Sequence, residues 1–141
     1  MLGYVPILKS KPAEIWAWGR ATPAVLNNSR VLFEIVPVTG KGAPVDNFVS
    51  RLARNWPTGS VVTVDSNRVN GPNSVVLQVA QKLQQRQILE RPVVRLDDSP
   101  RILAEVAAAC VLHSQGACLR LGSEEQDPNP SMPAGQLARV L

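Results

Sequence analysis

The sequence is poor in the residues from which metal sites and disulfides are built. Its 141 residues include two cysteines, Cys110 and Cys118, and a single histidine, His113. The cysteines do not have the spacing of zinc ligands, and one histidine and two cysteines cannot make a convincing zinc site. Two cysteines also give no disulfide framework, which makes a reducing compartment the default expectation. The sequence therefore assigns no metal site, and it identifies no cofactor.

Long apolar runs are missing as well. A membrane-spanning helix needs about 20 consecutive apolar residues, and no stretch approaches that length. The opening segment, MLGYVPIL, is short and lacks the positively charged start of a signal peptide. We therefore expect a soluble, cytoplasmic protein.

Charged residues make up 18% of the chain, and the formal net charge is +4. Residues 1–60 hold seven Lys or Arg against three Asp or Glu, whereas residues 61–141 hold eight of each kind. A basic excess of this size is common on solvated surfaces. Because no dense Lys/Arg run or aromatic-interleaved motif accompanies it, we do not expect nucleic acid as a partner.

Strand and helix patterns alternate along the chain. Short runs rich in Val, Ile and Leu, bounded by Pro, Gly, Ser or Asn, predict strands at residues 4–9, 31–37, 60–66, 91–97 and 117–122. Apolar residues at helical spacing predict helices within residues 10–18, 44–56, 72–88 and 100–116. This βα repeat predicts one domain over residues 1–125 with a parallel sheet. Residues 126–141 are polar and Pro-rich, and we expect them to form a tail in which a further helix begins near Pro133.

Each predicted strand has one apolar face and one face with a single charge near its C-terminal end. These five residues are Lys9, Glu34, Asp65, Arg95 and Arg120. A doubly wound sheet is covered by helices on both faces and should be apolar throughout, whereas a (β/α) barrel turns one face inward. The pattern predicts a partial (β/α) TIM-barrel-like domain with about five parallel strands. The alternative is a five-stranded, flavodoxin-like open sheet.

Five strands cannot close an eight-stranded barrel. We therefore expect self-association, or a partner chain that supplies the missing strands and covers the inner face. No membrane partner is expected.

The same five charged residues are the candidate ligand-binding residues. Lys9, Arg95 and Arg120 could hold the phosphate or carboxylate of an anionic small molecule, and Glu34 and Asp65 could hold a hard cation such as Mg²⁺ beside it. The sequence leaves two other interpretations open. One is an internal salt-bridge layer. The other is a metal-dependent enzyme acting on a phosphorylated or carboxylated small molecule, for which no catalytic residue can be named.

Several stretches resemble a known family. YVPILKSKPAE, VLFEIVP, VVTVDSNRV, RPVVRLDD and GACLRLGSEE occur in this order over about residues 4 to 125, and together they resemble the beta protein family, found in bacteria and named for a phage protein. The resemblance implies a barrel-like fold of which this chain matches an N-terminal half. It names no functional residue and leaves the molecular function open, and the family name alone suggests a phage-related or defence-related context. Taken with the charged residues, it leads us to expect a binding or interaction module with an anion-accommodating barrel mouth.

Overall fold

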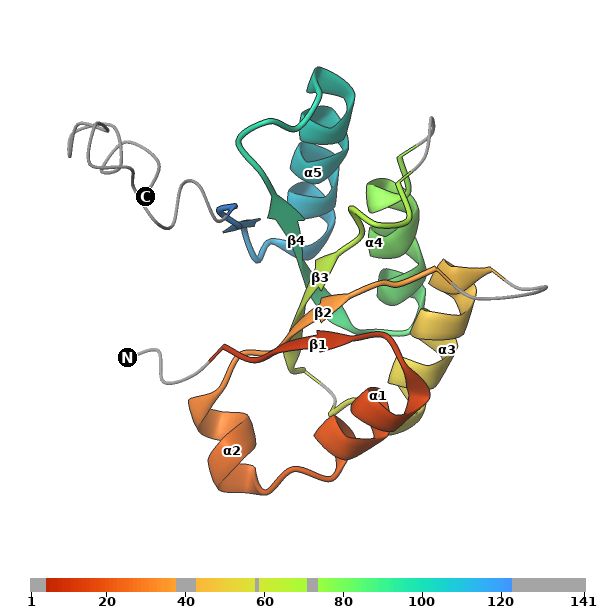
Figure 1. Ribbon diagram of the computed structural model, residues 1–141, viewed down its shortest axis with the longest axis vertical. Helices are drawn as coiled ribbons and strands as arrows, with labels where there is room; N and C mark the ends of the chain where they lie inside the picture. Colours follow the sequence, from red (N-terminus) through yellow and green to blue (C-terminus); the bar gives the residue numbers. More distant parts are fainter. Residues whose placement is uncertain (1–4, 38–42, 58, 71–73, 123–141) are drawn as a thin grey trace.

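The computed structural model describes residues 5–37, 43–57, 59–70 and 74–122 (Figure 1). Its strands are β1 (Ile7–Lys9), β2 (Leu32–Glu34), β3 (Val61–Asp65), β4 (Leu89–Val94) and β5 (Cys118–Leu119). Its helices are α1 (Pro12–Gly19), α2 (Pro23–Asn28), α3 (Pro44–Asn55), α4 (Val76–Gln85) and α5 (Pro100–His113). None of the helices in these ranges is long and apolar enough to cross a membrane. The predicted tail, residues 126–141, lies outside the described residues.

All five strands pair in parallel, in the order β1-β2-β3-β4-β5. The α/β class and the parallel sheet predicted from the sequence are thereby confirmed. A flavodoxin-like sheet has the order 2-1-3-4-5, which places its first strand inside the sheet. The sequential order is instead that of neighbouring strands in a (β/α) barrel, so the topology favours the partial barrel over the flavodoxin-like alternative.

The helices that follow the strands form a layer on one side of the sheet (Figure 1). Within this layer α1 contacts α3, α3 contacts α4, and α4 contacts α5. Proline at the first position of α3 and of α5 suits these helix starts, because that position needs no N–H. The short helix α2, which the sequence patterns did not predict, has no buried residue.

The hydrophobic core lies between the sheet and this helical layer. Phe33 and Ile35 of the β2 segment are fully buried, and so is Val62 of β3. The apolar stripe of α3 packs against them, and the Phe33 and Phe48 rings lie 5.8 Å apart with a tilt of 55°. Alternation along each strand explains this placement, because residues two apart point to the same face.

The opposite face of the sheet is concave and partly uncovered. Ile7 of β1, which is 52% exposed, points to this face, and so does Cys118 of β5, the register partner of Val93. Both residues line one cavity of about 630 Å³. Because β1 and β5 are the two edges of the sheet, a cavity lined by both shows that the sheet curves with this face inside.

One charged residue breaks the apolar pattern on the helix-facing side. Glu90, in β4, is 2% exposed, and its Oε2 has no hydrogen-bond partner among the described residues. Its backbone N–H donates to Nδ1 of His113 in α5 at 3.2 Å, while Nε2 of His113 lies 2.9 Å from the carbonyl oxygen of Ala80 in α4. Burial raises the pKa of Glu90 to about 8. The expectation of one purely apolar face on every strand is therefore wrong for β4.

Candidate functional site

The charged residues predicted from the sequence gather at the carboxyl ends of the strands. Lys9 is the register partner of Glu34, and Glu34 is the partner of Asp65 on the next strand. Arg95 directly follows β4, and Arg120 directly follows β5. Because parallel strands all end at the same edge of the sheet, side chains from distant parts of the sequence meet there.

Asp65 is the centre of this cluster. Arg95 binds it in bidentate fashion, with Nη1 donating to Oδ1 at 2.9 Å and Nη2 donating to Oδ2. Nη1 of Arg120 donates to Oδ2 at 2.6 Å, and the backbone N–H of Asn67 donates to Oδ1 at 3.0 Å. Burial by itself would raise the pKa of Asp65, but the hydrogen bonds and the charge of Arg95, together with the Asn67 and Arg120 hydrogen bonds, lower the pKa below 3.8. Asp65 is therefore a buried, fully paired carboxylate.

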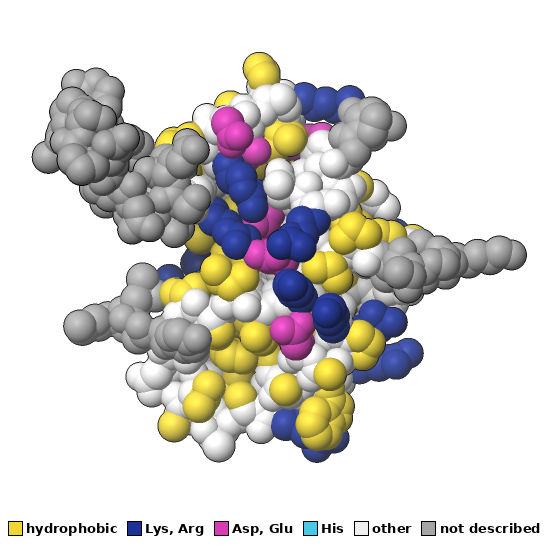
Figure 2. Space-filling view, viewed as in Figure 1, with side chains coloured by type: hydrophobic (Ala, Val, Ile, Leu, Met, Phe, Trp, Pro, Cys, Tyr) yellow, Lys and Arg dark blue, Asp and Glu magenta, His cyan; other side chains and the backbone are white. Residues whose placement is uncertain are grey.

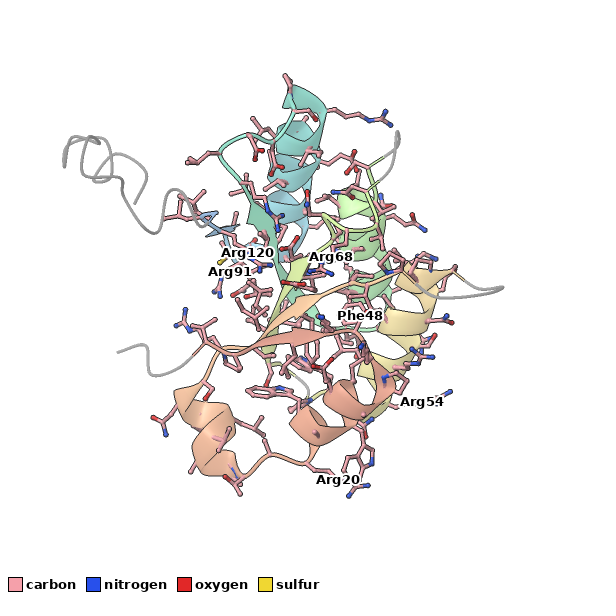
Figure 3. All side chains as sticks on the ribbon, viewed as in Figure 1. Arg20, Phe48, Arg54, Arg68, Arg91 and Arg120 are labelled. Atoms are coloured by element: carbon pink, nitrogen blue, oxygen red, sulfur yellow. The ribbon has the colours of Figure 1, made fainter. Side chains whose placement is uncertain are left out.

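Glu34 occupies a similar position on β2. It is 7% exposed, and its Oε1 lies 2.7 Å from Nη2 of Arg120. Arg120 thus bridges both carboxylates with its two terminal nitrogens. On the other side, Nε of Arg68 lies 3.2 Å from Oε2 of Glu34 without hydrogen-bond geometry (Figure 3). The charged residue in the middle of VLFEIVP is therefore neutralised by arginines from two later segments of the chain.

Arg68 belongs to the cluster although the strand pattern did not predict it. It lies in the turn after β3, three positions beyond Asp65, where side-chain alternation no longer applies. Its position in a segment leaving the carboxyl end of a strand is the signal that could have identified it. Lys9, by contrast, was predicted from the strand pattern but does not join the cluster. It is exposed, and it makes no ion pair with any described residue.

The cluster is a salt-bridge layer that carries a positive excess. Three guanidinium groups, from Arg68, Arg95 and Arg120, face two carboxylates, from Glu34 and Asp65. The salt-bridge arrangement left open by the sequence is thus present in the structure. These salt bridges do not use every N–H donor of the arginines, because each guanidinium carries five N–H groups.

The geometry gives little room for a metal between the carboxylates. In the described ranges, no group of three or more His, Cys, Asp or Glu residues could hold a metal ion. Guanidinium nitrogens lie against Oε1 of Glu34 and both oxygens of Asp65. A divalent cation would have to displace Arg120 from both carboxylates. Cys118, close by on β5, is not an activated thiolate, because burial raises its pKa despite the charges of Arg91 and Arg120.

Two arginines of the cluster also reach the concave face. Arg95 and Arg120 line the cavity of about 630 Å³, and its other lining residues within the described part of the chain carry no charge: Val5, Ile7, Leu32, Cys118, Leu119, Leu121 and Gly122. Figure 2 shows Lys and Arg side chains gathered around acidic ones in the middle of this view, with hydrophobic side chains beside them. The cavity therefore combines apolar walls with a basic rim.

Comparisons with known proteins bear on the family. No curated protein matches the chain, and no solved structure matches it. The model of one family, described as Beta protein, matches residues 4–141. The match extends through residues 126–141, which lie beyond the stretches that resemble the family by inspection. Because it covers nearly the whole sequence, the chain belongs to the Beta protein family.

Proposed function

We propose that the protein binds an anionic small molecule on the concave face of its sheet. Arg95 and Arg120 hold the phosphate or carboxylate group, and the apolar walls of the cavity receive the rest of the ligand. The observation that carries this proposal is the composition of the cavity: among the described residues that line it, these two arginines are the only charged ones. Pockets of several hundred Å³ with mainly apolar walls and a few placed polar groups are the usual form of small-molecule sites.

In this proposal Glu34 and Asp65 position the arginines and do not touch the ligand. Their side chains are 9% and 3% exposed, whereas those of Arg95 and Arg120 are 24% and 25% exposed. Arg120 uses one N–H toward each carboxylate, and Arg95 uses two toward Asp65. Their remaining N–H groups are free to bind an anion bidentately. Lys9, exposed beside Glu34, adds positive charge at this edge.

The metal-dependent enzyme is the weaker candidate. It needs Glu34 and Asp65 as metal ligands or acid–base groups, and the arginines already bind their oxygens. A phage-related or defence-related role rests on the family name alone.

We also propose that further strands cover the concave face in the working assembly. Ile7 is exposed on this face, and β1 and β5 are edge strands of the described sheet. Exposed edges and apolar faces favour pairing with additional strands, from a second copy or from another chain. Light scattering after size exclusion measures the solution mass. A dimer supports pairing with a second copy. A monomer that cross-links to another protein supports pairing with another chain. A monomer that cross-links to nothing contradicts the proposal.

The anion site is tested by calorimetric titration at low salt with octyl phosphate, inorganic phosphate and octanol. The proposal expects octyl phosphate to bind most tightly, because only this probe has both a charged group and an apolar chain. Arg120→Gln should weaken binding at least about tenfold, the cost of one charge-assisted hydrogen bond. Since this change also leaves two carboxylates less well paired, Ile7→Gln on the exposed cavity wall is a second variant with no ion pair to break.

The matched control is Arg54→Gln, which removes the same charge from the exposed last turn of α3. It should leave binding unchanged. If octanol binds as tightly as octyl phosphate, or if Arg54→Gln weakens binding as much as Arg120→Gln, the assigned site is wrong.

A further inference from the structure

A second cavity, of about 390 Å³, lies toward the amino ends of the strands. Its walls come from segments that lead into strands, including Arg30 and Val31 before β2, Ser60 and Val61 at the start of β3, and Gln115 before β5. The two cavities have no lining residue in common. This cavity is therefore separate from the carboxylates that end β2 and β3.

The charge in this cavity is of one sign. Among the described residues, its charged lining residues are Arg30 and Arg91, and no Asp or Glu lines it. Nε of Arg91 donates to the backbone oxygen of Gln115 at 3.1 Å, which fixes the guanidinium and leaves its terminal nitrogens available. Within the described ranges, no carboxylate forms an ion pair with either arginine. They differ in this from Arg95 and Arg120, which are neutralised by Asp65.

Two tryptophans supply flat apolar surface to the same cavity. Trp18, from α1, is 9% exposed, and Trp56 follows the end of α3. The indole N–H of Trp56 donates to the backbone oxygen of Ser60 at 2.9 Å, so this ring is held in one orientation. Aromatic surface beside unpaired guanidinium groups suits a ligand with a flat ring and an anionic substituent.

The geometry points to a binding site for a small planar anion, an aromatic ring that carries a phosphate or a carboxylate. Arg30 and Arg91 bind the anionic group, and Trp18 and Trp56 contact the ring. The site does not depend on the anion site at the carboxyl ends of the strands. Arg91 is the register partner of Thr63 and so lies on the same face of the sheet as Asp65, and the charges of Arg91 and Arg120 both act on Cys118.

The three tryptophans of the sequence allow a direct test by ¹H–¹⁵N spectroscopy of their indole N–H groups. Trp18 and Trp56 line the cavity, whereas Trp16 lies outside it, 54% exposed with the Arg20 guanidinium 4.4 Å from its ring centroid. The chain is titrated separately with adenosine 5′-monophosphate and with 2-naphthoate. We expect the Trp18 and Trp56 signals to shift saturably and the Trp16 signal to stay in place. The tighter of the two probes identifies the phosphate or the carboxylate as the favoured group.

Variants then separate the charge from the rings. Arg91→Gln and Arg30→Gln should each weaken binding at least about tenfold, and adenosine without its phosphate should bind correspondingly less well. Arg30 is exposed, so Arg30→Gln keeps the test decisive if Arg91→Gln does not fold. Arg54→Gln, outside the cavity, serves as the control of equal charge change. If neither probe gives a saturable shift, if all three indole signals move alike, or if the arginine variants bind as the wild type does, the site is refuted.

Discussion

Replacing Glu90 with glutamine should stabilise the protein at neutral pH and leave its stability nearly unchanged in acid. Glu90 is 2% exposed in β4, its Oε2 has no described hydrogen-bond partner, and burial raises its pKa from 4.5 to about 8. The folded chain therefore keeps a proton on Glu90 at pH 7, whereas the unfolded chain releases it. Holding that proton costs free energy of folding, and glutamine, which does not titrate, removes this cost.

The sign and size of the effect follow from these two pKa values. Below pH 4.5 Glu90 is protonated in both the folded and the unfolded state, so its protonation costs no free energy of folding. As the pH rises from 4.5 toward 8, the folded state loses stability relative to the unfolded state by about 1.4 kcal/mol per pH unit. At pH 7 the accumulated difference is about 3 kcal/mol, and above the folded pKa it levels off near 5 kcal/mol.

The assay is urea unfolding followed by far-ultraviolet circular dichroism at pH 5, 6, 7 and 8, with wild type and Glu90→Gln measured side by side. The observable is the difference in the free energy of unfolding, because contributions from groups that both proteins share cancel in it. Asp97→Asn is the matched control. It also converts a carboxylate to an amide, but at an exposed position just beyond β4.

The difference in the free energy of unfolding between Glu90→Gln and wild type should grow with pH. The difference between Asp97→Asn and wild type should not show this growth. A difference between Glu90→Gln and wild type that stays the same at every pH would refute the reasoning, since it means that Glu90 is ionised in the folded state or reaches water. An unchanged urea dependence of the free energy would show that the comparison concerns the same folding transition.

Three further changes test the packing and the charge layer. Asp65→Asn should lower the free energy of unfolding by roughly 3 kcal/mol in urea at pH 7, because it removes the charged partner of Arg95 and Arg120. Because the pKa of Asp65 is lowered in the folded state, this loss should have its full size above pH 3.8 and shrink below that pH. A loss that does not depend on pH would contradict the pairing. His113→Ala should cost roughly 3 kcal/mol, because the ring bridges two buried backbone groups; a thermal melt like that of the wild type would contradict this. Phe48→Ala should lower the free energy of unfolding by about 3–5 kcal/mol, because Phe48 is 1% exposed and its ring packs against that of Phe33. A loss below about 1 kcal/mol would mean that the core can close over the gap.

The sequence predicted the elements well where periodicity was strong. The stripe of α3, with Val45, Phe48, Val49 and Leu52 buried, follows directly from helical spacing. The helix α2 was missed because six residues with none buried leave no apolar stripe to detect. Glu90 was missed for a different reason. The strand was expected to start at Arg91, after it, whereas β4 begins at Leu89, and element boundaries are fixed by pairing with neighbouring strands.

The candidate site was predicted in part. Strand alternation placed Glu34 and Asp65 on one face, and the structure pairs them across β2 and β3. It could not predict that Arg68 would join them and that Lys9 would not, because a turn residue follows no alternation and an exposed lysine has no fixed partner. Nor could it predict the second cavity, whose arginines and tryptophans are far apart in the sequence.

What the sequence determined by itself is local: which segments become strands and helices, which faces are apolar, and that every strand brings a charge to the same edge. These features depend on periods of two and 3.6 residues, which need no knowledge of neighbours. The tertiary structure decided which charges neutralise one another. Arg120 reaches Glu34 and Asp65 only because β5 lies in a sheet that curves back toward β1. Curvature depends on the twist and packing of all five strands together, and no single segment contains it.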